Sequence, residues 1–133
     1  MISKYLSDIG LNESDLPWNC ECLDPDRIEQ LAEQRKIHGF DARDTYSLRN
    51  TIAMLIYPRL KMYDEVSGEL IDKDFYKFEY KNKEYTFQEC IYMVLEGLKL
   101  YLTKYDFDMT DEEMESVIDS MVILGKIWLY LWW

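Results

Sequence analysis

Few side chains in this sequence have the types and spacing that enzymes need for catalysis. The single histidine, His38, follows Arg35 and Lys36 at a place where a cation would complement the negative end of a helix. Cys20 and Cys22 are separated by one residue, which does not match the Cys-x-x-Cys spacing of redox and zinc motifs. The spacing suggests no Ser-His-Asp arrangement and no glycine-rich phosphate loop. The sequence therefore predicts that the protein is not an enzyme and holds no cofactor or metal ion.

Asp41, Arg43 and Asp44 form a charged group directly before a helical pattern. They could act as an acid pair tuned by an arginine. More often, such a group makes a turn and cap network in which Asp44 or Ser47 accepts backbone N–H bonds. We favour the cap network and keep ligand binding as the alternative, in which cations hold a phosphate and tyrosines stack on a base. The candidate ligand-binding residues are Asp41, Arg43, Asp44, Arg49, Arg59 and Lys61.

A run of carboxylates precedes and opens the last expected helix. Acids in the first turn of a helix complement its positive end, at about 0.3–1 kcal/mol each. The alternative is that exposed carboxylates imitate phosphates and occupy a cationic groove of a nucleic-acid-binding protein. A calcium loop starting at Asp106 is not expected, because its sixth position is Asp111 and its twelfth is Val117. The run comprises Asp106, Asp108, Asp111, Glu112, Glu113, Glu115 and Asp119.

Aromatic residues are concentrated at the C-terminus and in a lysine-rich segment at residues 73–85. Trp128, Tyr130, Trp132 and Trp133 would make a helix apolar on all sides. Such a helix is either buried in its own core or forms an interface with a partner or another copy. Four lysines, interleaved with tyrosines, could form a nucleic-acid strip. We favour their being gatekeepers that protect a strand edge from aggregation, and expect no direct nucleic-acid binding; they are Lys73, Lys77, Lys81 and Lys83.

These groups must be positioned by helices and one hairpin. Helical spacing predicts helices over residues 2–9 and 25–38, and a third from residue 48 to Asp64 or Val66 that Pro58 should kink. A period of two between residues 75 and 87 predicts a β-hairpin that leans on a helix or pairs with a partner's strand. Thr86–Glu89 and Thr110–Glu113 are capping boxes that open the last two helices. We predict that the last helix buries Met114, Val117, Ile118, Met121, Leu124 or Gly125, and Trp128.

The expected fold is therefore mainly α: a compact bundle of four to five helices with one inserted β-hairpin. Its 133 residues, 48% of them hydrophobic, suffice for one domain spanning residues 1–133. The net charge of −11 should repel polyanions and attract a basic protein. The apolar stretch 121–133 is shorter than the roughly 20 residues of a membrane span. With an odd number of cysteines and no secretory signal, we expect the protein in the cytoplasm of a bacterial host.

One segment carries a resemblance. Residues 39–48 read Gly-aromatic-Asp-x-x-Asp-Thr-aromatic-Ser-Leu, followed by an apolar helix and Pro-Arg-Leu-Lys at residues 58–61. The segment resembles one found in small uncharacterised proteins of bacteriophages and other mobile elements, and a weaker echo lies at residues 110–121. The resemblance implies no activity. Together with the acidic charge it suggests a non-catalytic protein that binds and inhibits a basic host protein in defence or nucleic-acid handling, such as an anti-CRISPR or anti-restriction protein. The alternatives are an oligomeric sponge for a nucleotide immune signal and a phage assembly or scaffolding component.

Overall fold

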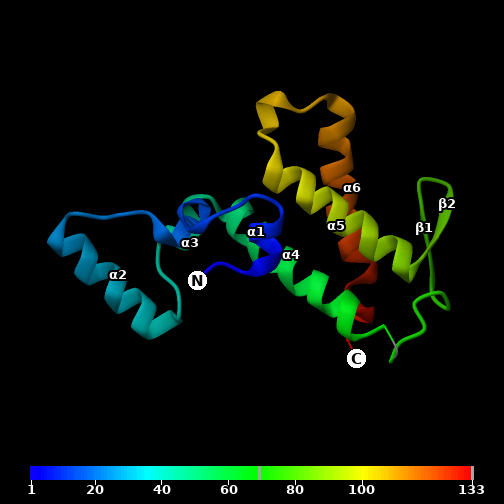
Figure 1. Ribbon diagram of the computed structural model, residues 1–133, viewed down its shortest axis with the longest axis horizontal. Coiled ribbons are helices and arrows are strands. Elements are labelled where there is room, and N and C mark those ends of the chain that lie inside the picture. The colour runs from blue at the N-terminus through cyan, green and yellow to red at the C-terminus, as the bar shows by residue number, and fades with distance from the viewer. Residues whose placement is uncertain (69, 133) are drawn as a thin grey trace. The chain divides into compact units, whose positions relative to one another are not determined.

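A computed structural model describes residues 1–68 and 70–132 of the chain (Figure 1). The described residues form six α-helices, several single turns of 3-10 helix and one two-stranded antiparallel sheet. The prediction of a mainly α fold with an inserted β-hairpin is therefore confirmed. The chain divides into two compact units, Met1–Leu55 and Ile56–Trp133. A single domain over the whole chain stays a prediction.

The first unit holds three complete helices and the start of a fourth. Its best-marked helix, α2, spans Pro25–His38 and begins and ends at the predicted residues. The Asp24 carboxylate accepts a bond from the Asp26 N–H, and Gly39 has the left-handed φ of 81° that ends the helix. The other elements are α1 (Lys4–Asp8), η1 (Glu13–Asp15), η2 (Pro17–Asn19), α3 (Arg43–Tyr46) and the beginning of α4 (Leu48–Val66).

Helix α4 continues without interruption through Pro58, as the apolar spacing predicts. At its start, the carbonyl of Ser47 accepts bonds from the N–H groups of Asn50 and Thr51. The four-residue helix α3 just before it was not predicted and lies where the sequence indicated a turn.

The second unit contains the β-hairpin, formed by β1 (Lys77–Tyr80) and β2 (Lys83–Thr86). The strands are joined by Lys81 and Asn82, which both have positive φ, as a tight hairpin turn that follows the sheet twist requires. The hairpin packs on α5 and α6, which confirms that it leans on helices. The remaining elements are α5 (Phe87–Thr103), η3 (Asp106–Asp108), α6 (Asp111–Ile127) and η4 (Trp128–Tyr130).

Helices α5 and α6 form a helical hairpin (Figure 1). Both predicted capping boxes are present, with the hydroxyls of Thr86 and Thr110 accepting bonds from the N–H groups of Glu89 and Glu113. The two helices approach closely at Gly97, where a Cβ would lie 2.3 Å from the Cβ of Ser120. The buried core of this pair consists of Phe87, Cys90, Ile91, Val94, Leu95 and Leu98 of α5 with Ser120, Ile123, Leu124 and Ile127 of α6.

The predicted buried face of α6 was largely wrong. Of its members Leu124 is buried, whereas Met114, Ile118, Met121 and Trp128 are exposed. The helix carries apolar residues on two faces, and its period alone does not distinguish them. The buried face is the one that presents the small Ser120 to Gly97, because only small side chains permit this close approach.

Among the described residues, no helix has the length and apolarity of a membrane span.

Candidate interaction surface on the α5–α6 hairpin

Three of the predicted acidic residues are engaged within the second unit. Glu113 accepts from the Thr110 N–H in the capping box and forms an ion pair of 2.8 Å with Lys104, the residue that ends α5. The hydrogen bond from Lys104 lowers the pKa of Glu113. This carboxylate therefore joins the C-terminal end of α5 to the N-terminal end of α6.

Asp119 and Glu115 of α6 bind the turn of the β-hairpin. The Tyr80 hydroxyl donates a bond of 2.5 Å to Asp119, and the Lys81 ammonium pairs with Asp119 at 3.0 Å and with Glu115. The hydrogen bond from Tyr80 is the main reason that the pKa of Asp119 is lowered. The pKa of Lys81 is raised, first by Glu115 and then by Asp119. These two acids are therefore partly neutralised by the protein's own chain.

Asp108, Asp111 and Glu112 are exposed and have no ion pair or side-chain hydrogen bond within the described residues. Asp111 and Glu112 lie in the first turn of α6, where they also complement its positive end. Asp106 is exposed next to Asp108 on η3. The structure thus divides the acidic run into members with a structural role and members whose charge faces solvent.

An exposed pair of aromatic rings lies among these acids and was not singled out from the sequence. Tyr105 and Phe107 are 72% and 83% exposed, with ring centroids 5.4 Å apart and planes inclined by 12°. The alternation Tyr-Asp-Phe-Asp before a capping box was the available signal. Rings stacked on each other in solvent leave their outer faces open to a cationic side chain.

We call the exposed apolar side of α6 the outer face; it consists of Met114, Ile118, Met121 and Val122. These side chains are 39%, 62%, 38% and 40% exposed. Their spacing of four, three and one residues places them on one side of the helix. Single exposed apolar residues are ordinary, but a row of four along one helix face is a candidate contact surface.

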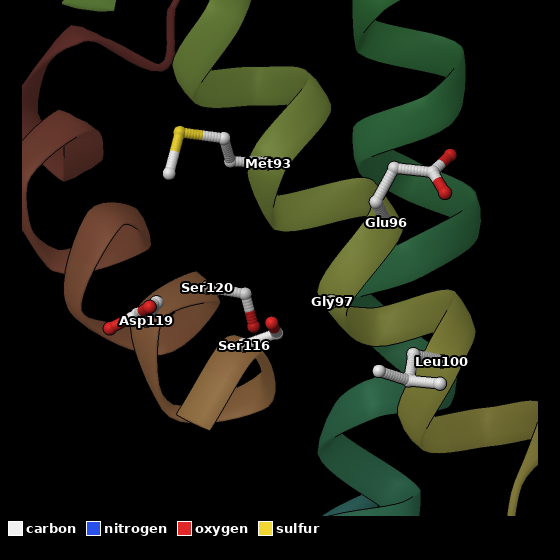
Figure 2. Close-up of a pocket in the computed structure, with 7 residues that line it drawn as sticks. All are labelled: Met93, Glu96, Gly97, Leu100, Ser116, Asp119 and Ser120. Atoms are coloured by element: carbon white, nitrogen blue, oxygen red, sulfur yellow. The ribbon is translucent and has the colours of Figure 1, made fainter. Parts of the chain in front are cut away.

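A groove of about 410 Å³ lies between α5 and α6 (Figure 2). The hydroxyl groups of Ser116 and Ser120 point from α6 toward Gly97, while the side chains of Glu96 and Asp119 point away from the groove (Figure 2). Polar hydroxyls and apolar side chains therefore face the groove, whereas the two carboxylates at its edge are directed away from it. Its lining residues are Met93, Glu96, Gly97, Leu100, Ser116, Asp119 and Ser120.

Of the predicted aromatic residues at the C-terminus, one packs within the protein and two are exposed. Tyr130 packs on the hairpin, with its ring 5.0 Å from Phe78 in an edge-on contact. Trp128 and Trp132 are 60% and 69% exposed. Trp133 lies outside the described residues. The Tyr63 hydroxyl donates bonds of 3.4 and 3.1 Å to the carbonyls of Tyr130 and Trp132, which fixes this segment on the second half of α4.

Lys73 does not act as an edge gatekeeper, contrary to our interpretation. It lies before the strands, its side chain is 6% exposed, and its ammonium donates to the Asp64 carbonyl at 2.7 Å and carboxylate at 3.0 Å. The Gln88 amide also donates to this carboxylate. A buried ion pair needs such additional bonds to offset desolvation. Lys77 and Lys83 lie exposed on the strands, where gatekeepers are expected.

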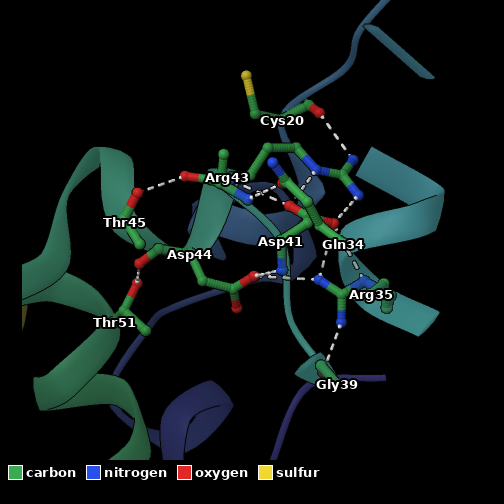
Figure 3. A network of polar contacts seen from close by, with 10 residues as sticks. Cys20, Gln34, Arg35, Gly39, Asp41, Arg43, Asp44, Thr45 and Thr51 are labelled. Carbon is green, nitrogen blue, oxygen red and sulfur yellow. Dashed lines mark hydrogen bonds and ion pairs between the residues drawn. The ribbon is translucent and has the colours of Figure 1, made fainter. Parts of the chain in front are cut away.

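The first unit brings together Asp41, Arg43 and Asp44 of the candidate ligand site and adds Arg35 (Figure 3). The Asp41 carboxylate is fully buried and pairs with Arg43 at 2.7 Å and with Arg35 at 3.0 Å. The hydrogen bond from Arg43 lowers the pKa of Asp41 well below its usual range, with Arg35 adding to the effect. Arg43 also donates to the carbonyl of Cys20.

Asp44 accepts a bond of 2.9 Å from the Asp41 N–H, as the cap interpretation predicts. In this network the guanidinium groups of Arg35 and Arg43 already form ion pairs with the protein's own carboxylates (Figure 3). Of the remaining candidate ligand residues, Arg49 lies in the first turn of α4, whereas Arg59 and Lys61 lie on the part of α4 that belongs to the second unit.

No protein-family model and no solved structure matches the chain. The chain is similar to the uncharacterized ATP-dependent helicase YqhH of Bacillus subtilis (strain 168), with 26% identity over 109 residues. The alignment covers 80% of the chain and 17% of that protein, so the chain spans about a sixth of the length of the relative that it matches.

Proposed function

We propose that the chain is a non-catalytic interaction protein that binds a basic surface of a nucleic-acid-handling protein and keeps nucleic acid away from it. The observation that carries the proposal is the set of exposed carboxylates without cationic partners in the described residues, Asp108, Asp111 and Glu112. In a chain of net charge −11, these groups present an unneutralised negative field to solvent. Such a field steers and selects a cationic partner.

The similarity to one sixth of a protein named as an ATP-dependent helicase supports a setting in nucleic-acid handling. A region of this size has the length of an accessory domain. In the phage-type form of the proposal, the bound protein belongs to host defence in the bacterial cytoplasm. An anti-CRISPR or anti-restriction inhibitor is the most concrete version.

The test compares two variants with the same change in net charge. The α6 charge variant is Asp108→Asn, Asp111→Asn and Glu112→Gln. The α2 charge variant neutralises three acids in and just before α2 that are also exposed and unpaired within the described residues, Glu21→Gln, Glu29→Gln and Glu33→Gln. Each is used to capture proteins from a bacterial lysate at about 0.1 M salt, where exposed charges still interact over about 10 Å.

We expect the wild type and the α2 charge variant to capture the same protein, and the α6 charge variant to lose it. The captured protein, once purified, should lose binding to a duplex DNA oligonucleotide when the wild-type chain is added. Equal capture by all three forms would refute the proposed site. Undiminished DNA binding in the presence of a bound chain would refute the inhibitory role.

A further inference from the structure

We propose that the outer face of α6 is the docking site for one basic amphipathic helix of the protein partner. This inference rests on the proposed function and names the part of the partner that is bound. It starts from a feature that the carboxylates do not explain: α6 has a second apolar side, formed by Met114, Ile118, Met121 and Val122, in addition to the side packed on α5.

The spacing of the outer face selects a helix as its occupant. Met114, Ile118 and Met121 are four and three residues apart, so they form a strip along the side of the helix, with Val122 next to it. A partner helix presents its own apolar residues in the same repeat. Two of the four side chains are methionines, whose flexible thioethers adapt to different apolar surfaces. The neighbouring Ile118 is the most exposed member, at 62%, and is suited to be the central anchor.

The charge along the border of the outer face selects a basic occupant. Glu115 and Asp119 follow Met114 and Ile118 by one residue each, so they line one border of the strip one turn apart. Lys81 contacts both carboxylates and supplies a single positive charge for the two. Toward the N-terminus of α6 lie the unpaired acids Asp108, Asp111 and Glu112. A helix with Lys or Arg beside its apolar strip complements this border.

The aromatic pair lies just before the N-terminal end of α6. Tyr105 and Phe107 lie on the connection that leads from α5 into α6, and both rings are mostly exposed. The planar guanidinium of an arginine stacks on such rings and can pair at the same time with a neighbouring carboxylate. Arginines at one end of the partner helix therefore fit this part of the surface best.

The same charges argue against the other occupants. A nucleic acid would bring phosphates against the border carboxylates. A second copy in a twofold interface would bring Glu115 and Asp119 against the same patch of its partner. Neither occupant gains from a surface that is apolar in its centre and acidic at its edge.

The test measures binding of labelled peptides by fluorescence anisotropy. The amphipathic peptide has about 18 residues, with leucines at helical spacing and lysines and arginines elsewhere. The scrambled peptide has the same composition, with the leucines distributed around the helix. The outer-face variant is Ile118→Ser with Met121→Ser; its matched control is Ile28→Ser with Ile37→Ser, which changes two exposed isoleucines of α2. Circular dichroism checks that both variants fold.

We expect the wild type to bind the amphipathic peptide at least about tenfold more tightly than the scrambled one, and the outer-face variant to lose about tenfold, the size of a moderate interface anchor. The α2 control should change binding less than about twofold, as expected for a residue outside the interface. Equal affinity for the two peptides, or full binding by the outer-face variant, would overturn the inference.

The α6 charge variant distinguishes failure of the helix-docking inference from failure of the proposed function. If both peptides bind equally but the α6 charge variant weakens both, the acidic site stands and the helix-docking inference falls. If that variant also binds normally, both fall. Sedimentation velocity supplies the last outcome: a wild-type dimer that the outer-face variant converts to a monomer would assign the outer face to a second copy and overturn the inference.

Discussion

Replacing Gly97 by alanine is expected to force α5 and α6 apart. The new Cβ would lie 2.3 Å from the Ser120 Cβ, 2.4 Å from its Oγ and 3.2 Å from the Ser116 carbonyl oxygen. Carbon atoms in contact are about 3.5–4.0 Å apart, so the helices would have to separate by more than about 1 Å. Since the Ser120 Cβ is attached directly to the backbone, no side-chain rotation relieves the contact.

The expected loss follows from two opposing effects. Overpacking of a tight contact costs about 3 kcal/mol where the backbone must move, and alanine in a helix recovers about 1 kcal/mol relative to glycine. The net loss is about 2 kcal/mol of unfolding free energy, or roughly 8 °C in Tm for a chain of this size. Gly125 of α6 is the matched control, because a Cβ there meets no atom within 4 Å. Gly125→Ala should gain about 1 kcal/mol.

Urea denaturation followed by circular dichroism measures both variants. A third variant, Gly97→Ala with Ser120→Gly, removes the atoms that clash and should be more stable than the sum of the two single changes predicts, by about 1–2 kcal/mol. If Gly97→Ala were as stabilising as Gly125→Ala, the close approach of α5 and α6 at this point would be refuted.

Three further predictions concern buried polar groups. Lys73→Met should lower the unfolding free energy by about 3 kcal/mol in a urea titration, because it leaves the Asp64 carboxylate without its ammonium partner. Replacing Asp64 by leucine in the same variant should restore part of the lost unfolding free energy. Burial raises the pKa of the Cys90 thiol to about 11, so at pH 8 a thiol reagent should modify the exposed Cys20 at once and Cys90 only in urea; rapid reaction of Cys90 in the folded protein would contradict its burial. Because the pKa of Asp41 is lowered on folding, its ion pairs contribute fully to the unfolding free energy above the ordinary pKa of about 3.9, and this contribution declines as pH falls from there toward the lowered pKa. Asp41→Asn should therefore cost about 2–3 kcal/mol at pH 7, less than a fully buried pair since one arginine partner is 43% exposed, and the gap to the wild type should narrow between pH 4 and pH 2.

The parts of the fold that were predicted correctly depend on local signals. Thr86 and Thr110 open helices because their hydroxyls bond to N–H groups three residues later, and both partners are visible in the sequence. Asp24 and Gly39 mark the two ends of α2 for equally local reasons. The hairpin was recognisable from its period of two and its turn residues.

The parts that were missed depend on contacts between distant residues. Which side of α6 is buried is decided by the approach of Gly97 to Ser120, and neither residue is apolar enough to enter a hydrophobic pattern. Lys73 is buried because its ammonium pairs with Asp64, and Gln88 donates to the same carboxylate. Both residues are separated from Lys73 in sequence. For the same reason the acidic run could be identified from the sequence, but its division into paired and unpaired carboxylates could not.

Pro58 has a consequence for how α4 opens. The proline nitrogen carries no hydrogen, so the carbonyl of Met54 has no amide donor four residues later. The boundary between the two units, after Leu55, falls in this same turn. Unwinding of α4 can therefore begin at its middle as well as at its two ends, and the amides that exchange fastest with deuterated water would include those at the centre of the helix, where an uninterrupted helix protects them best.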